Sequence, residues 1–110
     1  MGLLLRAEHA ARILDEGKRW EIRASHTRKR GRIALLVVRQ DAWYVVGFAT
    51  IVRSMALTPT AARHNERLIQ APVVVASYKS PHAWVLECVR KCARQVRVPK
   101  RKGCVVWVKL

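Results

Sequence analysis

The sequence has few acidic residues and no long apolar run. Seven Asp and Glu stand against 22 Lys and Arg in 110 residues, and no acidic residue follows Glu87. No stretch approaches the ~20 apolar residues that a membrane-spanning helix needs. The three leucines near the start are too few for a secretory signal and are interrupted at once by Arg6. We therefore expect an intracellular protein, cytoplasmic or nuclear, that has no membrane partner.

Cysteine is also scarce, because only Cys88, Cys92 and Cys104 are present. An odd number without a secretory signal favours reduced thiols. Cys88 and Cys92 fall in a segment that we predict to be a strand, where four residues span about 13 Å. A zinc site shared with Cys104 and a histidine is the alternative, but this spacing favours small buried side chains. We expect no metal and no cofactor.

The basic residues form two blocks. Nine lie between Arg6 and Arg32, and eight lie between Arg90 and Lys109. The formal net charge of the chain is +15. A domain this basic repels itself unless it meets a polyanion, and phosphate backbones are the usual partner. A solubilising surface, or one that meets membrane lipids, is the alternative. The block arrangement favours RNA or single-stranded nucleic acid as the partner.

The first block contains a helix and a strand. Residues 6 to 16 carry alanine and spaced apolar residues, which predict a helix, and Gly17 suits the position just after its end. Residues 20 to 24 then alternate, so Trp20 and Ile22 should face one side and Glu21 and Arg23 the other.

The middle of the chain predicts two further strands. Residues 32 to 38 form an apolar run typical of a buried strand. Residues 43 to 54 predict a long strand, and Gly47 inside it indicates a bulge or bend. We expect Trp43, next to a turn, to be the most exposed of the four tryptophans.

The last part predicts a second helix and the remaining strands. Thr58 and Pro59 suit the N-cap and first position of a helix that continues to about Gln70. Residues 72 to 77 predict a short strand or extended segment, and a long strand and a final strand follow. The pattern favours an α+β fold with a mainly β core, as a small barrel of five to six strands flanked by two or more helices.

Several segments together resemble a known family. They are GKRWEIR at residues 17 to 23, GRIALL, VVGFATIV, HAWVLE and the terminal VVWVKL. In this order they resemble the ASCH domain (activating signal cointegrator homology) of the PUA-like superfamily, so residues 1 to 110 are interpreted as a single ASCH domain. The resemblance implies a β-barrel with a cleft beside the motif that faces RNA. Some relatives hydrolyse acetylated cytidine; they keep the lysine that matches Lys18 but have a threonine where this chain has Glu21.

Three uses of Lys18, Glu21 and Arg23 remain open. In the first, they form an ion-pair group that closes the barrel mouth. In the second, Lys18 and Arg23 contact phosphate or a base edge, while Glu21 orients them or accepts from an exocyclic amine. In the third, Lys18 and Glu21 are the catalytic residues of a small hydrolase, with Ser25, Thr27 or Ser80 as nucleophile.

Three other groups complete the predicted nucleic-acid interface. Tyr78, Lys79 and His82 lie in a polar loop where a ring can stack on a base. Two basic loops are expected to contact phosphates, and they consist of Arg28, Lys29 and Arg30, and of Lys100, Arg101 and Lys102. The sequence thus predicts an RNA-binding module. The alternatives are a small hydrolase acting on a modified nucleoside or RNA, and a basic module that binds an acidic protein.

Overall fold

The computed structural model describes residues 1–40, 42–100 and 106–110. The described part is mainly β, with short helices added, as the α+β prediction requires. Its strands are β1 (Gly2–Leu5), β2 (Trp20–Arg23), β3 (Gly31–Arg39), β4 (Ala42–Ala56), β5 (His82–Val98) and β6 (Trp107–Val108). Its helices are α1 (Ala7–Asp15), α2 (Pro59–His64), α3 (Glu66–Ile69) and α4 (Pro72–Ser77).

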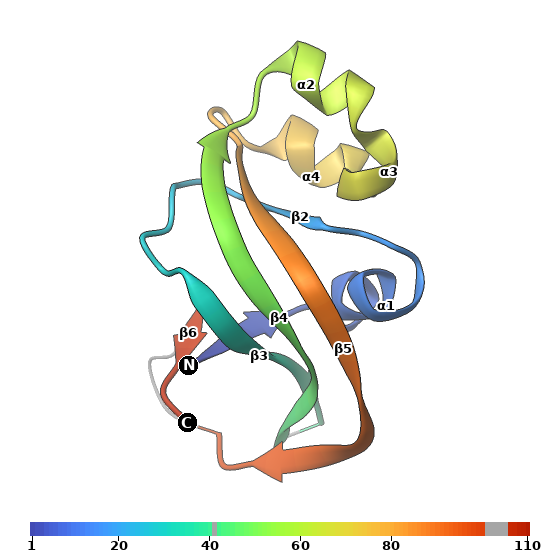
Figure 1. Cartoon of the computed structure of the whole chain (residues 1–110), viewed down its shortest axis with the longest axis vertical. Coiled ribbons are helices and arrows are strands. Elements are labelled where there is room, and N and C mark those ends of the chain that lie inside the picture. The colour runs from blue at the N-terminus through green and yellow to red at the C-terminus, as the bar shows by residue number, and fades with distance from the viewer. Residues whose placement is uncertain (41, 101–105) are drawn as a thin grey trace.

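All six strands belong to one curled sheet in the order β2-β5-β4-β3-β1-β6. β1 runs parallel to β3, and the other described pairs are antiparallel. Figure 1 shows the sheet curving around α1, while α2, α3 and α4, which connect β4 to β5, gather at one end of this long pair of strands. The curl brings β1 and β2, which do not pair with each other, to opposite sides of an opening. The fold is therefore a half-barrel whose mouth lies between these two strands.

The bulge predicted at Gly47 is confirmed. The register of β4 against β5 shifts between Val45 and Gly47, where Val45 pairs with Val96 and Gly47 with Lys91. A Cβ on Gly47 would lie 2.7 Å from the carbonyl oxygen of Arg90. Glycine is thus required because the backbone of β5 approaches too closely for any side chain.

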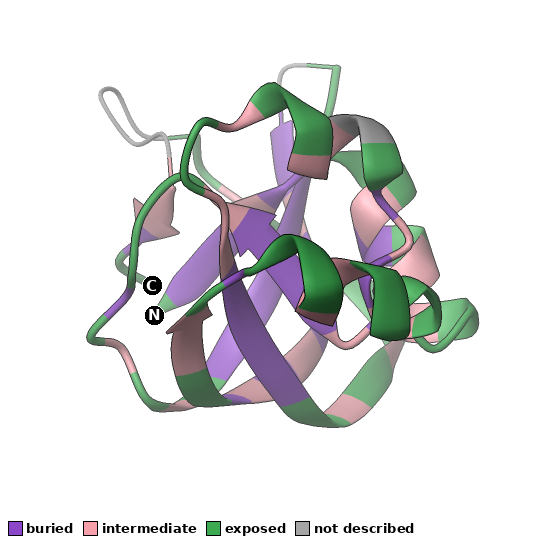
Figure 2. Ribbon diagram, turned by 90° about the horizontal axis from the view of Figure 1, so that it is seen from above, coloured by how far each residue is buried: buried purple, intermediate pink, exposed green. Residues whose placement is uncertain are grey.

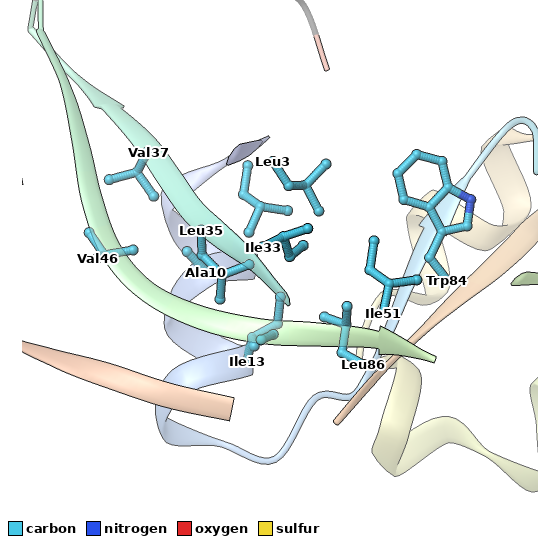
Figure 3. Close-up of a cluster of buried hydrophobic side chains, with 12 residues drawn as sticks. Leu3, Ala10, Ile13, Ile33, Leu35, Val37, Val46, Ile51, Trp84 and Leu86 are labelled. Atoms are coloured by element: carbon cyan, nitrogen blue, oxygen red, sulfur yellow. The ribbon is translucent and has the colours of Figure 1, made fainter. Parts of the chain in front are cut away.

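The inner face of the sheet forms the main core with α1. Ala10 and Ile13 of the helix pack against alternate residues of β1, β3 and β4, as Figure 3 shows. The predicted helix at residues 6 to 16 is confirmed, and Gly17, at φ +78°, follows it as expected. Figure 2 shows the result: buried strands at the centre, with helices and loops exposed around them.

Trp43 corrects one prediction, because only 2% of it is exposed. It packs with Leu36 and Val45 in a cluster on the other side of the sheet, where a β5 residue pairs with it. Trp20 and Trp84 are buried, and Trp107 is half-buried and stacks on Trp84. A neighbouring turn is therefore a poor indicator of exposure in a sheet this strongly curled.

The three helices after β4 also differ from the prediction. Thr58 is the expected N-cap, since its side chain accepts from the Ala61 amide at 3.1 Å. The helix ends early, however, because Asn65 adopts a non-helical conformation between α2 and α3. Residues 72 to 77 form helix α4 rather than a strand. Pro72 supplies the first helical position, and packing of Val74 and Val75 against a second core cluster outweighs the β-propensity of valine.

The two ends of the chain and the cysteines differ in part from the predictions. β1 was not predicted, and the final strand, expected from residue 104, is described only at Trp107–Val108. Cys88 is exposed and Cys92 half-buried, so the prediction of burial is wrong for Cys88, and Cys104 lies outside the described residues. No helix in the described ranges is long and apolar enough to cross a membrane.

Candidate functional site

A cleft of about 790 Å³ lies at the mouth of the half-barrel. Leu4 and Leu5 of β1 form one wall, and residues 21 to 23 of β2 form the other. The first turn of α1 and the end of α4 complete the rim. Lys18, Glu21 and Arg23 all line this cleft, so the structure brings together the three charged residues that the sequence singles out.

Lys18 is held in place by backbone carbonyls. Gly17 turns the chain after α1, and no part of Lys18 is exposed (0%). Its Nζ donates to the carbonyl oxygen of Trp20 at 3.0 Å and to that of Ile69. Burial lowers the pKa of Lys18 to about 8, against the Glu21 carboxylate, which raises it. Lys18 therefore joins β2 to α3 and has no exposed surface that a ligand could contact.

Glu21 is the centre of the charged group and is only 5% exposed. Its Oε2 accepts from Nε of Arg23 at 3.0 Å and lies 3.0 Å from Nη2 of the same guanidinium. Its Oε1 lies 3.9 Å from Nζ of Lys18. The ion pairs expected at the barrel mouth are thus present. Oε1 accepts no hydrogen bond from the described residues and remains available as an acceptor.

Arg23 is fixed from three sides. Besides the bonds to Glu21, its Nη2 donates to the carbonyl oxygen of Leu4 at 3.1 Å, across the mouth of the half-barrel. Its guanidinium lies 5.5 Å from the centroid of the Trp84 ring. The third nitrogen, Nη1, donates to none of the described residues. Arg23 thus presents one preorganised donor to a ligand, at low entropic cost.

His9 is a cleft residue that the sequence analysis missed. It lies in the first turn of α1, and its Nδ1 is buried without a hydrogen-bond partner among the described residues. Burial lowers the pKa of the ring below its usual 6.5, and the Lys18 ammonium acts in the same direction while Glu21 opposes them. The available signal was helical spacing, because His9 lies one turn before the buried Ile13.

Tyr78 is the one residue of the predicted polar loop that lines the cleft. Tyr78 is half-buried at the end of α4 and packs against the second core cluster. Lys79 is exposed outside the cleft, and His82 instead packs edge-on against His26, with ring centroids 4.2 Å apart.

The two basic loops lie outside the cleft. Arg28 and Arg30 are exposed and Lys29 is half-buried, in the segment between β2 and β3. Arg30 donates to the carbonyl of Thr27, which holds this loop in shape. Lys100 is exposed just after β5. Arg101 and Lys102 lie outside the described residues.

The hydroxyl groups considered as nucleophiles do not belong to the described lining of this cleft. Ser25, Thr27 and Ser80 are absent from its described lining, whereas Ser77 is present. Ser77 donates to the carbonyl oxygen of Val74 at 2.7 Å and has no described base beside it. Among the described residues, no three histidine, cysteine or acidic side chains are grouped as metal ligands.

Comparison with known proteins adds no relative. The chain matches none of the family models, and none of the curated proteins is similar to it. The chemistry of the cleft therefore rests on its own residues: an acceptor on Glu21, a fixed donor on Arg23, an aromatic ring on Tyr78 and apolar walls.

Proposed function

We propose that the chain is an ASCH-like, PUA-like barrel that binds single-stranded RNA in the cleft between β1 and β2. The observation that carries this proposal is the pairing of Arg23 and Glu21. Both are fixed by neighbours, yet Nη1 of Arg23 and Oε1 of Glu21 have no hydrogen bond to the described residues.

A donor beside an acceptor matches the edge of a base that carries an exocyclic amine. Carboxylates accept from the amine of cytosine, and arginine donates to ring or carbonyl acceptors. Unpaired bases are recognised in this way, by their edges and by stacking on aromatic rings, and Tyr78 supplies a ring at the rim. We therefore expect cytosine or adenine, which offer an exocyclic amine to Oε1 of Glu21, to be preferred over uracil, whose only edge donor is the ring N3–H.

The charge outside the cleft supports the same partner. The net charge of +15 and the exposed Arg28 and Arg30 supply attraction that does not depend on the base sequence. An acidic protein segment would satisfy these charges equally well. It would not use the flat ring of Tyr78 beside a donor–acceptor pair, and for this reason RNA is the preferred partner.

Affinity for short single-stranded RNAs of different base composition tests the proposal. Arg23→Ala should weaken binding by about 1–3 kcal/mol and reduce the preference among bases, because it removes a specific contact. Glu21→Gln should reverse or erase the preference for cytosine and adenine. Arg23→Lys keeps the charge but not the planar donor set, so it should retain phosphate attraction and lose the preference.

The basic loop between β2 and β3 provides the matched control. Replacing Arg28, Lys29 and Arg30 with alanine should weaken all RNAs alike and lower the slope of log affinity against log salt by about 2, at roughly 0.7 per phosphate contact. If the cleft and loop variants show the same uniform loss, or if acidic peptides compete as well as RNA, the cleft is not a base-recognition site. Circular dichroism of each variant checks that the fold is kept.

One observation favours a second candidate function, hydrolysis of an acetylated nucleoside. Glu21, which lines the cleft, lies beside Lys18, whose pKa burial lowers to about 8, so the carboxylate would be the acid or base and Lys18 its charged neighbour. Release of acetate from acetylated cytidine is the measurement. Turnover that Glu21→Gln abolishes, with RNA binding retained, would establish the hydrolase; the absence of turnover leaves binding as the activity.

A further inference from the structure

The distal half of β5 is a free sheet edge in the described structure. β2 pairs with β5 only through residues 82 to 85, while β4 pairs with β5 on the other side as far as Val98. From residue 87 to residue 98, every side chain of β5 is exposed or half-buried. This edge therefore offers its side chains to solvent and carries no further strand among the described residues.

The free edge is strongly basic. Arg90, Lys91, Arg94 and Arg97 are exposed within eight residues, and no acidic residue occurs after Glu87. Lys91 pairs with Asp15 at 2.8 Å. Within the described ranges, the side chains of the three arginines have no hydrogen-bond or ion-pair partner. Charged side chains on an edge strand also prevent aggregation, so a second feature is needed to identify a binding surface.

That feature is a long bulge in β5. Residues 92 to 95 lie between Lys91, paired with Gly47, and Val96, paired with Val45. Four residues of β5 thus face one residue of β4. Such a bulge bends the strand and turns backbone and side-chain donors in new directions. An added peptide strand needs a regular ladder of alternating donors and acceptors, which this bulge interrupts, whereas phosphate contacts need no register.

We propose that this basic edge, residues 90 to 97, binds the phosphate backbone of RNA outside the cleft. The two surfaces share one strand, because the near end of β5 pairs with β2, which forms the cleft wall. An RNA with one segment in the cleft can therefore continue along β5. This inference extends the proposed function but depends on separate residues, none of which lines the cleft.

Binding of two RNA lengths tests the proposal. The variant replaces Arg94 and Arg97 with glutamine, and its control replaces Arg53 and Arg67, two exposed arginines on other elements, in the same way. Both remove two charges. RNAs of about five nucleotides, near the lower limit of a single-domain site, and of about twenty are compared over a range of salt.

We expect the Arg94/Arg97 variant to bind the longer RNA several-fold more weakly, with a salt slope lower by about 1.4 because two phosphate contacts are lost. Its affinity for the short RNA should change less than about twofold, as should both affinities of the control variant. Equal losses for both lengths, or equal losses in the control, would overturn the proposal, since only the overall charge would then matter.

The outcome also separates this inference from the proposed function. If the longer RNA depends on Arg94 and Arg97 but neither RNA responds to Arg23→Ala, the β5 surface stands and the cleft proposal fails. If Arg23→Ala weakens both RNAs and the β5 variant neither, the cleft proposal stands and the β5 surface is edge protection only. Polyglutamate that displaces the longer RNA at equal charge would identify a protein partner and count against both.

Discussion

At the scale of single residues, Lys18 is subject to two opposing effects, burial and hydrogen bonding. Lys18 is buried without any exposed surface, which disfavours its charge, yet its hydrogen bonds join β2 to α3. A neutral amine still has two hydrogens, so it can keep both carbonyl partners. Deprotonation therefore removes the cost of the buried charge without breaking the link.

This gives a pH dependence for Lys18. The pKa is about 8 in the folded protein and 10.5 in the reference state. Between these values the unfolded chain binds the proton and the folded one does not, so the free energy of unfolding rises with pH. The rise should reach at most about 3 kcal/mol.

Chemical denaturation from pH 7 to pH 10.5 measures it, with Lys18→Met as the control, because every other group titrates in both proteins. The stability of the wild type relative to this variant should increase with pH. A difference that stays constant across the range would show that Lys18 keeps its proton.

The sequence predicts only part of the site at this scale. Alternation in β2 is a local property, so the pairing of Glu21 with Arg23 follows from their spacing. The burial of Lys18 depends on Ile69, 51 residues away, and the role of His9 depends on where α1 lies against β2. Neither of these tertiary contacts can be deduced from a single sequence.

At the scale of elements, Gly47 explains how the two longest strands, β4 and β5, curl together. A Cβ at this position would lie 2.5 Å from Cδ2 of Leu14 and 2.7 Å from the carbonyl oxygen of Arg90. The first contact can relax by side-chain rotation, but the second is with backbone. The glycine thus allows α1 and the bulge of β5 to meet the same point of β4.

Gly47→Ala should therefore destabilise the protein by about 1–3 kcal/mol, the usual cost of overpacking. Gly17→Ala is the comparison, because its Cβ meets nothing within 4 Å and only the φ of +78° opposes the substitution, at a cost of about 1 kcal/mol. Urea denaturation ranks the two variants. A smaller loss for Gly47→Ala than for Gly17→Ala would contradict this account of the bulge.

The elements that were predicted carry local signals, and those that were missed do not. Thr58 with Pro59 marks a helix start, and Gly17 marks a helix end, whatever the rest of the chain does. β1 has only four residues and is a strand because it pairs with β3, 32 residues further along. α4 was mistaken for a strand because its valines favour strands, and only their packing shows otherwise.

At the scale of the whole molecule, the dominant property is the excess of positive charge. A net charge of +15 on 110 residues repels itself in the compact state. Salt shortens the range of this repulsion, from about 30 Å at 0.01 M to about 8 Å at 0.15 M. The described part measures 40 × 28 × 25 Å, so the repulsion spans the molecule only at low salt.

The melting temperature should accordingly rise by a few degrees between these two salt concentrations. Sucrose at matched osmolality serves as the control for general solvent effects. A melting temperature that falls as sodium chloride is added would show that attractive ion pairs, such as the one between Lys91 and Asp15, outweigh the repulsion.

The bond from Arg23 to the carbonyl of Leu4 has a mechanical consequence. Elsewhere the sheet is held by ladders of backbone hydrogen bonds, whereas the two sides of the mouth are joined in the described structure by side chains, namely Arg23 to Leu4 and the stacked rings of Trp84 and Trp107. The two sides can therefore separate without any ladder being broken, and loss of the hydrogen bond from Arg23 to Leu4 is one part of the cost. A ligand that binds Arg23 and weakens its hydrogen bond to Leu4 also weakens the contact between β1 and β2. Ligand binding and the width of the cleft are therefore linked through Arg23.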